Sequence, residues 1–285
     1  MVAVLICLAG LLFTSCSYGF NDVFWRANNV TSRTENGTLY ELSPEEQIPA
    51  IDDSIYTVAV YSDIHFGKTG YDRHEQDFLD WLLDLQEKGQ TPRFCICLGD
   101  IADHGYRSEF QNYNEFTTKI EKITGTKVYN TLGNHDLYND GWKHYKELIF
   151  PYKSFYHFNT SNFSWYFLDN ASCSLGSKQF KELESKLKQD KAPKIIATHI
   201  PVYGNPFYFF GYFAMQNSDE SDELLTLFAE QNVKLLIDGH EHLYYKTSFG
   251  NYIEYTVPSI LVQNSWTLLT INENDGTIEQ ELIKK

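Results

Sequence analysis

Five short clusters of imidazole, carboxylate and amide side chains recur along the sequence, each directly after an apolar segment. They are SDIH (Asp63, His65), LGD (Asp100), LGNHD (Asn134, His135, Asp136), THIP (His199) and DGHEH (His240, His242). None of the clusters contains a cysteine. Neutral imidazole combined with hard oxygen donors suits Mn, Fe or Zn rather than a cysteine-rich structural zinc site. We therefore interpret the clusters as ligands of a catalytic metal centre.

The clusters supply more ligands than one tetrahedral ion needs, whereas two ions that share a carboxylate would use them all. Two metals about 3.5–4 Å apart can clamp the attacking and leaving oxygens of a phosphoryl displacement. Each ion also lowers the pKa of bound water, which makes hydroxide available near neutral pH. The ligand set therefore predicts a binuclear centre of divalent or trivalent ions that hydrolyses a phosphate ester with metal-activated hydroxide.

The apolar segments that precede the clusters have the composition of buried strands. They are IYTVAVYSDIH, RFCICLGD, KVYNTLGNHD, KIIATHIP and VKLLIDGHEH. In α/β sheets, ligands bind in the crevice beyond the carboxyl ends of strands, so we expect the clusters to meet in space. Because a strand alternates its faces, Asp63 and His65 should project the same way, as should His240 and His242.

Helical patterns alternate with these strands. We expect helices around residues 77–86 with a stop at Gly89, around Phe110, Tyr113, Phe116 and Ile120, around Phe180, Leu183 and Leu187, and from a cap at Ser218 through Glu230. Residues 154–169 read as a hairpin, and the chain from residue 244 is β-rich with a turn at 274–276. Cys95 and Cys97 alternate within FCICL, which favours small core residues on one strand face. One α/β domain over residues 51–285 accounts for the pattern.

The order DxH, GD, GNHD, H and GHxH resembles that of the calcineurin-like metallophosphoesterases, from about Tyr56 to Leu243. The resemblance implies a four-layer αββα sandwich with two mixed β-sheets. It also implies the metal ligands by position. One ion would be held by Asp63, His65 and His242, the other by Asn134, His199 and His240, and Asp100 would bridge the two.

The resemblance further gives roles to the two residues after Asn134. His135, when protonated, would stabilise the phosphoryl oxygens and donate a proton to the leaving group, a role worth roughly 10²–10⁴-fold in rate. Asp136 would hydrogen-bond an imidazole and keep it charged. The alternative for Asp136 is that it only caps a helix.

Substrate contacts are expected from two segments. Asp103 and His104 follow Asp100 in GDIADHG, close enough to reach over the metals, although a helix N-terminus or loop role is the alternative. Asp103 also stands where purple acid phosphatases have a metal-bound Tyr, which disfavours that subfamily. The aromatic segment at residues 203–216, with Tyr203 and Phe207, follows His199. It could be a loop packed on itself, a wall that stacks a base or sugar, or a lip that faces a membrane or partner.

The N-terminus resembles a targeting segment. Residues 2–13 are apolar but too short to span a bilayer comfortably, which fits a secretory signal. FTSC resembles a bacterial lipobox, so we predict a signal at residues 1–16 and a lipid anchor at Cys16. A plain cleaved signal or an uncleaved anchor are the alternatives. Residues 17–50 are polar without periodicity and predict a tether.

The charge limits the kind of substrate. The 285-residue chain has a formal net charge of −15, which argues against general nucleic-acid binding. A small phosphorylated substrate remains compatible, because bound metals invert the local field.

We therefore expect an exported phosphoesterase at the cell envelope, periplasmic or extracellular, with a slight preference for diesters over monoesters. The alternatives are a non-catalytic surface lipoprotein that binds metal or a partner on the same fold, and a protein phosphatase, which would need an open groove for a polypeptide.

Overall fold

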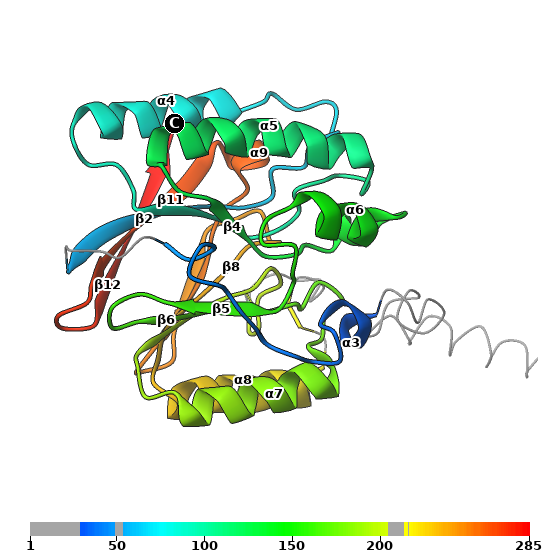
Figure 1. The fold of residues 1–285 in the computed structure, drawn as a ribbon, viewed down its shortest axis with the longest axis vertical. Helices are drawn as coiled ribbons and strands as arrows, with labels where there is room; N and C mark the ends of the chain where they lie inside the picture. Colours follow the sequence, from blue (N-terminus) through cyan, green and yellow to red (C-terminus); the bar gives the residue numbers. More distant parts are fainter. Residues whose placement is uncertain (1–28, 49–53, 205–213, 216) are drawn as a thin grey trace, which may run out of the picture.

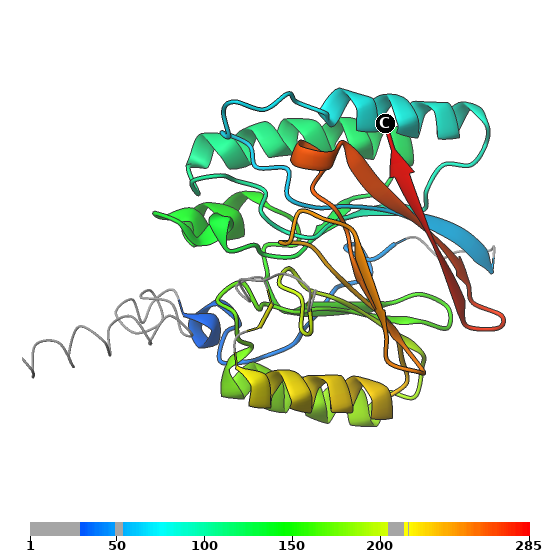
Figure 2. The same cartoon turned by 180° about the vertical axis from the view of Figure 1, so that it is seen from behind.

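The chain folds into two facing β-sheets with helices on both outer faces, as seen in a computed structural model (Figure 1, Figure 2). The structure describes residues 29–48, 54–204, 214–215 and 217–285. Its layers run helix, sheet, sheet, helix, and both sheets contain parallel and antiparallel neighbours. The predicted four-layer αββα sandwich with two mixed sheets is confirmed.

The larger sheet has the strand order β1-β5-β6-β7-β8-β10-β9 within the described residues. Its strands are β1 (Tyr40–Glu41), β5 (Tyr156–Asn159), β6 (Ser164–Phe167), β7 (Lys194–Ala197), β8 (Val233–Asp238), β9 (Tyr245–Ser248) and β10 (Ile253–Thr256). β5 and β6 pair antiparallel as the predicted hairpin. β6, β7 and β8 are parallel neighbours, so the polar segments after β7 and β8 emerge at the same edge.

The smaller sheet has the order β12-β11-β2-β3-β4. Its strands are β2 (Ile55–Tyr61), β3 (Phe94–Cys97), β4 (Val128–Asn130), β11 (Ser265–Asn272) and β12 (Thr277–Lys284). β2, β3 and β4 are parallel, which brings the segments after all three to one edge. β11 and β12 form a hairpin around the predicted turn at residues 274–276.

Helices α4 (Glu75–Glu87) and α5 (Arg107–Thr124) cover the smaller sheet, and α7 (Gly176–Gln189) and α8 (Ser218–Glu230) cover the larger one (Figure 1). Shorter helices are α3 (Val30–Arg33), the 3₁₀ helix η3 (His135–Leu137), α6 (Gly141–Leu148) and α9 (Ile260–Gln263). The cap of α8 is Asn217 rather than the predicted Ser218. The Asn217 side chain accepts the Asp219 and Glu220 N–H groups, and Ser218 is the first helical residue. Within the described residues, no helix has both the length and the apolarity needed to cross a membrane.

Strand alternation builds the layers. In β2, Val58 and Val60 face the space between the sheets, whereas Ala59 and Tyr61 face α4 and α5. In β3, Cys95 and Cys97 point to the helix side and are buried and free of disulfides, as predicted. Every strand before a predicted cluster is thus held on both faces. This fixes the direction in which its last residues emerge.

Part of the predicted tether is folded instead. Within residues 29–48, β1 pairs with β5, and Leu39 and Leu42 are buried in the core. Arg33 is also buried, and its guanidinium donates to both carboxylate oxygens of Asp169 at 2.8 Å. The tether prediction fails here because the few apolar residues of this segment find partners on a sheet edge that is remote in sequence.

We predict that Arg33→Ala lowers the free energy of unfolding by about 3–5 kcal/mol, because it leaves the buried Asp169 carboxylate without its cation. Urea denaturation of the variant and the parent chain measures the difference. Arg107→Ala is the matched control, since Arg107 pairs with Glu147 on the exposed surface. It should change stability by less than about 1 kcal/mol. Equal small losses in both variants would show that the Arg33 pair does not anchor this segment.

Candidate metal centre

The predicted ligands converge from both sheets. Asp63 and His65 follow β2, Asp100 follows β3, and Asn134 follows β4, all in the smaller sheet. His199 follows β7, and His240 and His242 follow β8, in the larger sheet. The sequence predicted that these clusters meet in space, and the structure shows that they do so where the strand ends of the two facing sheets come together.

The loops that carry these ligands have an unusual backbone. Five of the seven predicted ligands adopt φ values in the left-handed region, which non-glycine residues rarely occupy. They are Asp63 (55°), His65 (45°), Asp100 (50°), His240 (65°) and His242 (60°). Such conformations cost of order 1–3 kcal/mol each and persist where the surrounding structure fixes them, often at functional sites.

The first ligand group comprises Asp63, His65, Asp100 and His242, whose donor atoms lie within 4.8 Å of one another. The Nε2 atoms of His65 and His242 are 3.2 Å apart, and His242 Nε2 is 3.3 Å from Asp63 Oδ1. Asp63 is held from behind, because its Oδ2 accepts the His240 N–H at 2.9 Å.

The second group comprises Asp100, His199 and His240, also within 4.8 Å of one another. His199 donates from Nδ1 to the Leu98 carbonyl at 2.6 Å, which fixes its tautomer and turns Nε2 toward the site. That Nε2 lies 3.0 Å from Asn134 Oδ1. The amide oxygen of Asn134 is thereby placed beside this group.

Asp100 belongs to both groups. Its Oδ1 lies 3.4 Å from His199 Nε2, and its Oδ2 lies 3.6 Å from His65 Nε2. One carboxylate oxygen therefore faces each group, which is the arrangement needed to bridge two ions.

The electrostatics of the site suit cations. Burial opposes ionisation of Asp63, yet the neighbouring His242 outweighs it, and the pKa of Asp63 is lowered to about 2. Burial and the nearby His199 lower the pKa of His240 to about 4, which keeps this imidazole neutral. Asp63 Oδ1 is buried and makes no hydrogen bond. Burial opposes protonation of His199, yet Asp100 raises the pKa of this imidazole to about 9, so a bound ion would displace its proton. The carboxylates, the imidazoles and the unbonded Asp63 oxygen together fit a pair of metal ions.

His135 is more accessible than most of the ligands, with a side chain 26% exposed. Its backbone N–H donates to Asp100 Oδ1 at 2.8 Å, and its Nδ1 donates to the Asp103 carbonyl at 2.8 Å. Nε2 is left to face a substrate. Its ring lies 4.7 Å from the His65 ring, centroid to centroid, directly beside the first ligand group.

The role predicted for Asp136 is wrong. Its carboxylate is fully buried and accepts the N–H groups of Ala102 and Gly133, at 2.8 and 2.9 Å, rather than contacting an imidazole. Burial and the nearby Asp100 raise the pKa of Asp136 to about 8, so it is poorly suited to hold a neighbouring imidazole charged. Asp136 instead ties the loop after β3 to the loop after β4, on which Asp100 and Asn134 are carried.

Asp103 occupies the place that was expected for Asp136. Its Oδ1 lies 3.4 Å from His65 Nδ1 and 3.7 Å from His135 Nδ1, and its side chain is nearly buried. The Asp103 carboxylate therefore lies beside two imidazoles, and its backbone carbonyl accepts the His135 Nδ1–H, whereas the sequence suggested a substrate contact. His104 is exposed at the rim, with Nδ1 3.3 Å from Asp103 Oδ2. Asp103 forms a close third group with His65 and His135, and His104 is not part of it.

Two exposed aromatic residues lie on segments that follow metal ligands. Tyr203 was a predicted substrate contact, and Tyr138 was not predicted. Tyr203 is 44% exposed and packs edge-on against Phe249, whereas Phe207 lies outside the described residues. The sequence did not single out Tyr138, which is 43% exposed with its ring 4.7 Å from that of His135. The spacing of Tyr138 from His135 could have indicated this contact, because side chains three residues apart lie on the same side of a 3₁₀ helix such as η3.

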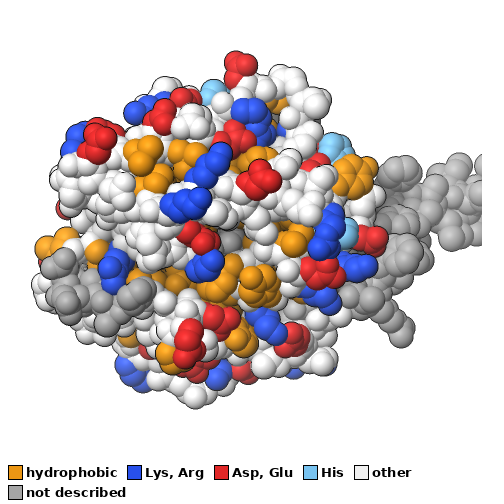
Figure 3. Space-filling model, turned by 45° about the horizontal axis from the view of Figure 1, so that its top comes forward, with side chains coloured by type: hydrophobic (Ala, Val, Ile, Leu, Met, Phe, Trp, Pro, Cys, Tyr) orange, Lys and Arg blue, Asp and Glu red, His pale blue; other side chains and the backbone are white. Residues whose placement is uncertain are grey.

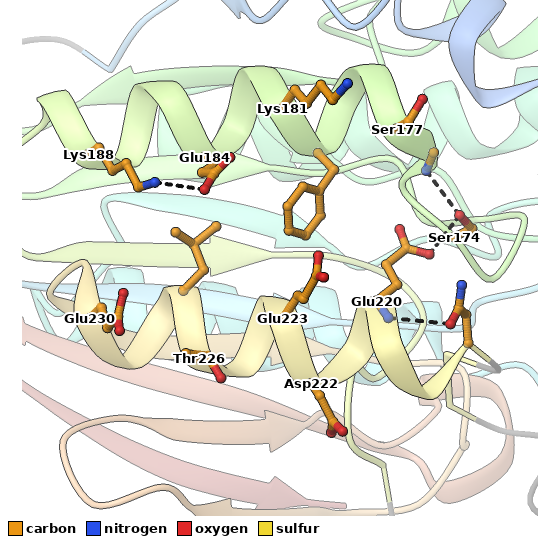
Figure 4. Close-up of a pocket in the computed structure, with 14 residues that line it drawn as sticks. Ser174, Ser177, Lys181, Glu184, Lys188, Glu220, Asp222, Glu223, Thr226 and Glu230 are labelled. Atoms are coloured by element: carbon orange, nitrogen blue, oxygen red, sulfur yellow. Dashed lines mark hydrogen bonds and ion pairs between the residues drawn. The ribbon is translucent and has the colours of Figure 1, made fainter.

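A groove of about 970 Å³ lies elsewhere, between α7 and α8. Its lining includes Phe180, Lys181 and Glu184 of α7 and Glu223 and Thr226 of α8, and Glu223 points toward α7 (Figure 4). None of the described site residues lines this groove.

The comparisons with known proteins agree with this geometry. A family model described as calcineurin-like phosphoesterase matches residues 56–244, a range that contains all seven ligands. The chain belongs to this family. The family and the two ligand groups indicate a metal-dependent phosphoesterase that uses two metal ions. Comparison with curated proteins gives no match.

Solved structures share the fold of this phosphoesterase. A dimetal phosphatase from Danio rerio has 15% identity and a TM-score of 0.61, over 80% of this chain and 98% of that one. A purple acid phosphatase from yellow lupin seeds has 14% identity and a TM-score of 0.58, over 81% and 54% of the two chains. GAP50 of Plasmodium has 16% identity and a TM-score of 0.58, over 81% and 84%.

We predict that Asp136→Asn destabilises the protein by about 1–3 kcal/mol, because the amide NH₂ must face one of two buried N–H donors. Metal content measured by mass spectrometry should fall below two ions per chain, since both ligand loops depend on this carboxylate. Asp140→Asn, an exposed carboxylate that makes no capping bond, is the control and should change neither quantity. Unchanged stability with reduced turnover would instead support the imidazole-orienting role for Asp136.

Proposed function

We propose that the protein is a binuclear-metal phosphodiesterase that acts on a small phosphorylated substrate at the cell envelope. The observation that carries the proposal is the position of Asp100, with one oxygen toward each ligand group. We expect Mn, Fe or Zn to occupy the site, given imidazole, carboxylate and amide donors. When bound, the ions supply a hydroxide nucleophile near neutral pH and neutralise charge on the phosphate oxygens.

His135 is the residue placed to act on the leaving group. The Asp103 carbonyl accepts its Nδ1–H, so proton transfer to a substrate takes place at Nε2. The bond to the Asp103 carbonyl fixes the orientation of the His135 ring, and the Asp103 carboxylate lies close to both His135 and His65. Tyr138 beside His135 offers an exposed aromatic surface to the leaving group.

The charges around the site favour a diester over a monoester. A monoester dianion is commonly held by free Arg or Lys side chains in addition to metals. Two basic residues in the described chain contact site residues, and each is already paired with a carboxylate. Lys68 lies 3.2 Å from Asp103, and Arg73, which donates to the His65 carbonyl, pairs with Glu75. A diester carries one charge less and needs less neutralisation.

General nucleic-acid binding is not part of the proposal. On the face shown in Figure 3, Lys and Arg side chains are interspersed with Asp and Glu rather than gathered into a basic tract. The net charge of −15 also argues against general nucleic-acid binding.

Hydrolysis of bis-p-nitrophenyl phosphate and p-nitrophenyl phosphate by the purified full chain tests the proposal. We expect turnover with Mn²⁺ and none with chelator, and a higher kcat/KM for the diester. His135→Ala should lower kcat by about 10²-fold or more while two metals are retained. Asn134→Ala should lower both turnover and metal content.

His74→Ala is the matched control, because His74 contacts Asp77 away from the ligand groups. Its activity should equal that of the parent chain. Metal-loaded protein that hydrolyses neither ester would favour the non-catalytic metal- or partner-binding alternative. Preference for a phosphopeptide over both esters would favour a protein phosphatase.

The envelope location rests on the sequence of the first 16 residues. The apolar segment followed by FTSC supports export and lipid attachment at Cys16. In a bacterial host, labelled palmitate should enter the parent chain, and Cys16→Ala should abolish labelling and release the protein from membranes. Cys173→Ala is the control, since this cysteine lies in the folded domain. Labelling that survives in Cys16→Ala would exclude the anchor.

A further inference from the structure

Tyr138 brings a phenolic hydroxyl to the metal centre. Its ring lies 4.7 Å from the His135 ring, centroid to centroid, and the residue is 43% exposed. The hydroxyl hydrogen-bonds the side chain of Asn134. Tyr138 therefore contacts a predicted metal ligand and the predicted proton donor that follows it in the same turn.

The bond between Asn134 and Tyr138 leaves the phenolic proton available. Asn134 Oδ1 lies 3.0 Å from His199 Nε2, on the side of the second ligand group. The amide NH₂ is therefore the part of Asn134 that donates to the Tyr138 oxygen. A tyrosine hydroxyl can donate one hydrogen bond while it accepts another. Its O–H can thus be donated to a molecule bound at the metals.

The hydroxyl also lies close to the bridging carboxylate. Burial and then the Asp100 carboxylate raise the pKa of Tyr138. Because Asp100 has one oxygen toward each ligand group, a hydroxyl near it is near the place of both ions. His135 donates its N–H to the same carboxylate at 2.8 Å. The phenol and the His135 imidazole can therefore contact one substrate from neighbouring positions.

The backbone of Tyr138 is fixed by its own turn and by the loop after β3. The Tyr138 N–H donates to the His135 carbonyl at 3.1 Å. The next residue, Asn139, donates from its side chain to the His104 carbonyl at 2.8 Å, and a side chain at Gly105 would clash with the Tyr138 carbonyl oxygen. A donor that is held in place before the substrate binds needs no reorganisation during the reaction.

We propose that Tyr138 is a catalytic residue whose hydroxyl donates a hydrogen bond to a phosphoryl oxygen of the bound ester. This inference rests on the proposed function, because the hydroxyl would act in the same reaction as His135. In phosphoryl transfer the charge is spread over the equatorial oxygens of the transition state, and preorganised donors aimed at them lower the barrier. Lys68 and Arg73 are paired with carboxylates, so the phenol supplies a donor that these cations do not.

Tyr138→Phe tests the proposal, because it removes the hydroxyl and keeps the ring. With bis-p-nitrophenyl phosphate and Mn²⁺, the kcat of the full-length variant should fall by about 10²-fold, the loss typical of one removed transition-state donor. Mass spectrometry should still find two ions per chain. Orthovanadate, which mimics the phosphoryl transition state, should bind the metal-loaded variant more weakly by a similar factor in titration calorimetry.

Tyr152→Phe is the matched control, because Tyr152 is 48% exposed and packs against Phe150 rather than against a ligand. Its turnover and vanadate binding should equal those of the parent chain. Tyr138→Phe with the parent's turnover and vanadate affinity would overturn the proposal, since only the ring would then matter. Loss of an ion from Tyr138→Phe would also overturn it, because the hydroxyl would then only orient Asn134.

The two readouts separate this inference from the proposed function. A metal-loaded parent chain that hydrolyses neither ester would contradict the proposed function, and vanadate binding would then still decide the role of the Tyr138 hydroxyl. A parent chain that also binds no vanadate would overturn both. Normal turnover in the parent chain and in Tyr138→Phe would overturn the role of the hydroxyl alone.

Discussion

The carboxylate of Asp100 is the interaction on which the site depends, because its two oxygens face two different ligand groups. This requires the end of β3, in the smaller sheet, to lie opposite the ends of β7 and β8 in the larger one. The apolar layer between the sheets sets that separation through residues such as Val60, Ile96 and Ile237. Packing at the centre of the sandwich therefore determines whether one carboxylate can bridge two ions.

The loops around Asp100 are stabilised by bonds that reach across strands. Asp136 accepts two N–H groups from different loops, and His135 donates its own N–H to Asp100. At Gly133, any side chain would meet the Asp100 N atom at 2.0 Å, so only glycine permits this approach. Five ligands can keep a left-handed backbone conformation because several contacts fix the loops that carry them.

The larger sheet contains buried carboxyl groups in addition to the imidazoles that follow its strands. Asp63 and Asp100 face the predicted ions, whereas Asp238 and Glu254 lie on the sheet face toward α7 and α8, alongside Leu236. The same strand, β8, thus carries apolar residues for most of its length and carboxylate only at its end. The metal ligands His240 and His242 therefore follow a strand whose buried residues are mostly apolar.

The sequence by itself determined the ligand types and the strands that present them. Those features follow from local spacing, since residues two apart on a strand share a face and parallel strands end together. The four-layer arrangement was implied by the resemblance to the family rather than by spacing. Cys95 and Cys97 were placed correctly for the same reason.

Only the tertiary structure decided which groups meet across the chain. Asp103 rather than Asp136 reaches His135, residues 29–48 join the sheet edge through Arg33, and Thr256 comes to lie opposite Asp238. Each of these contacts joins segments whose relative register is set by the packing of whole elements. Spacing along one segment carries no information about that register, which is why these partners could not be read from the sequence.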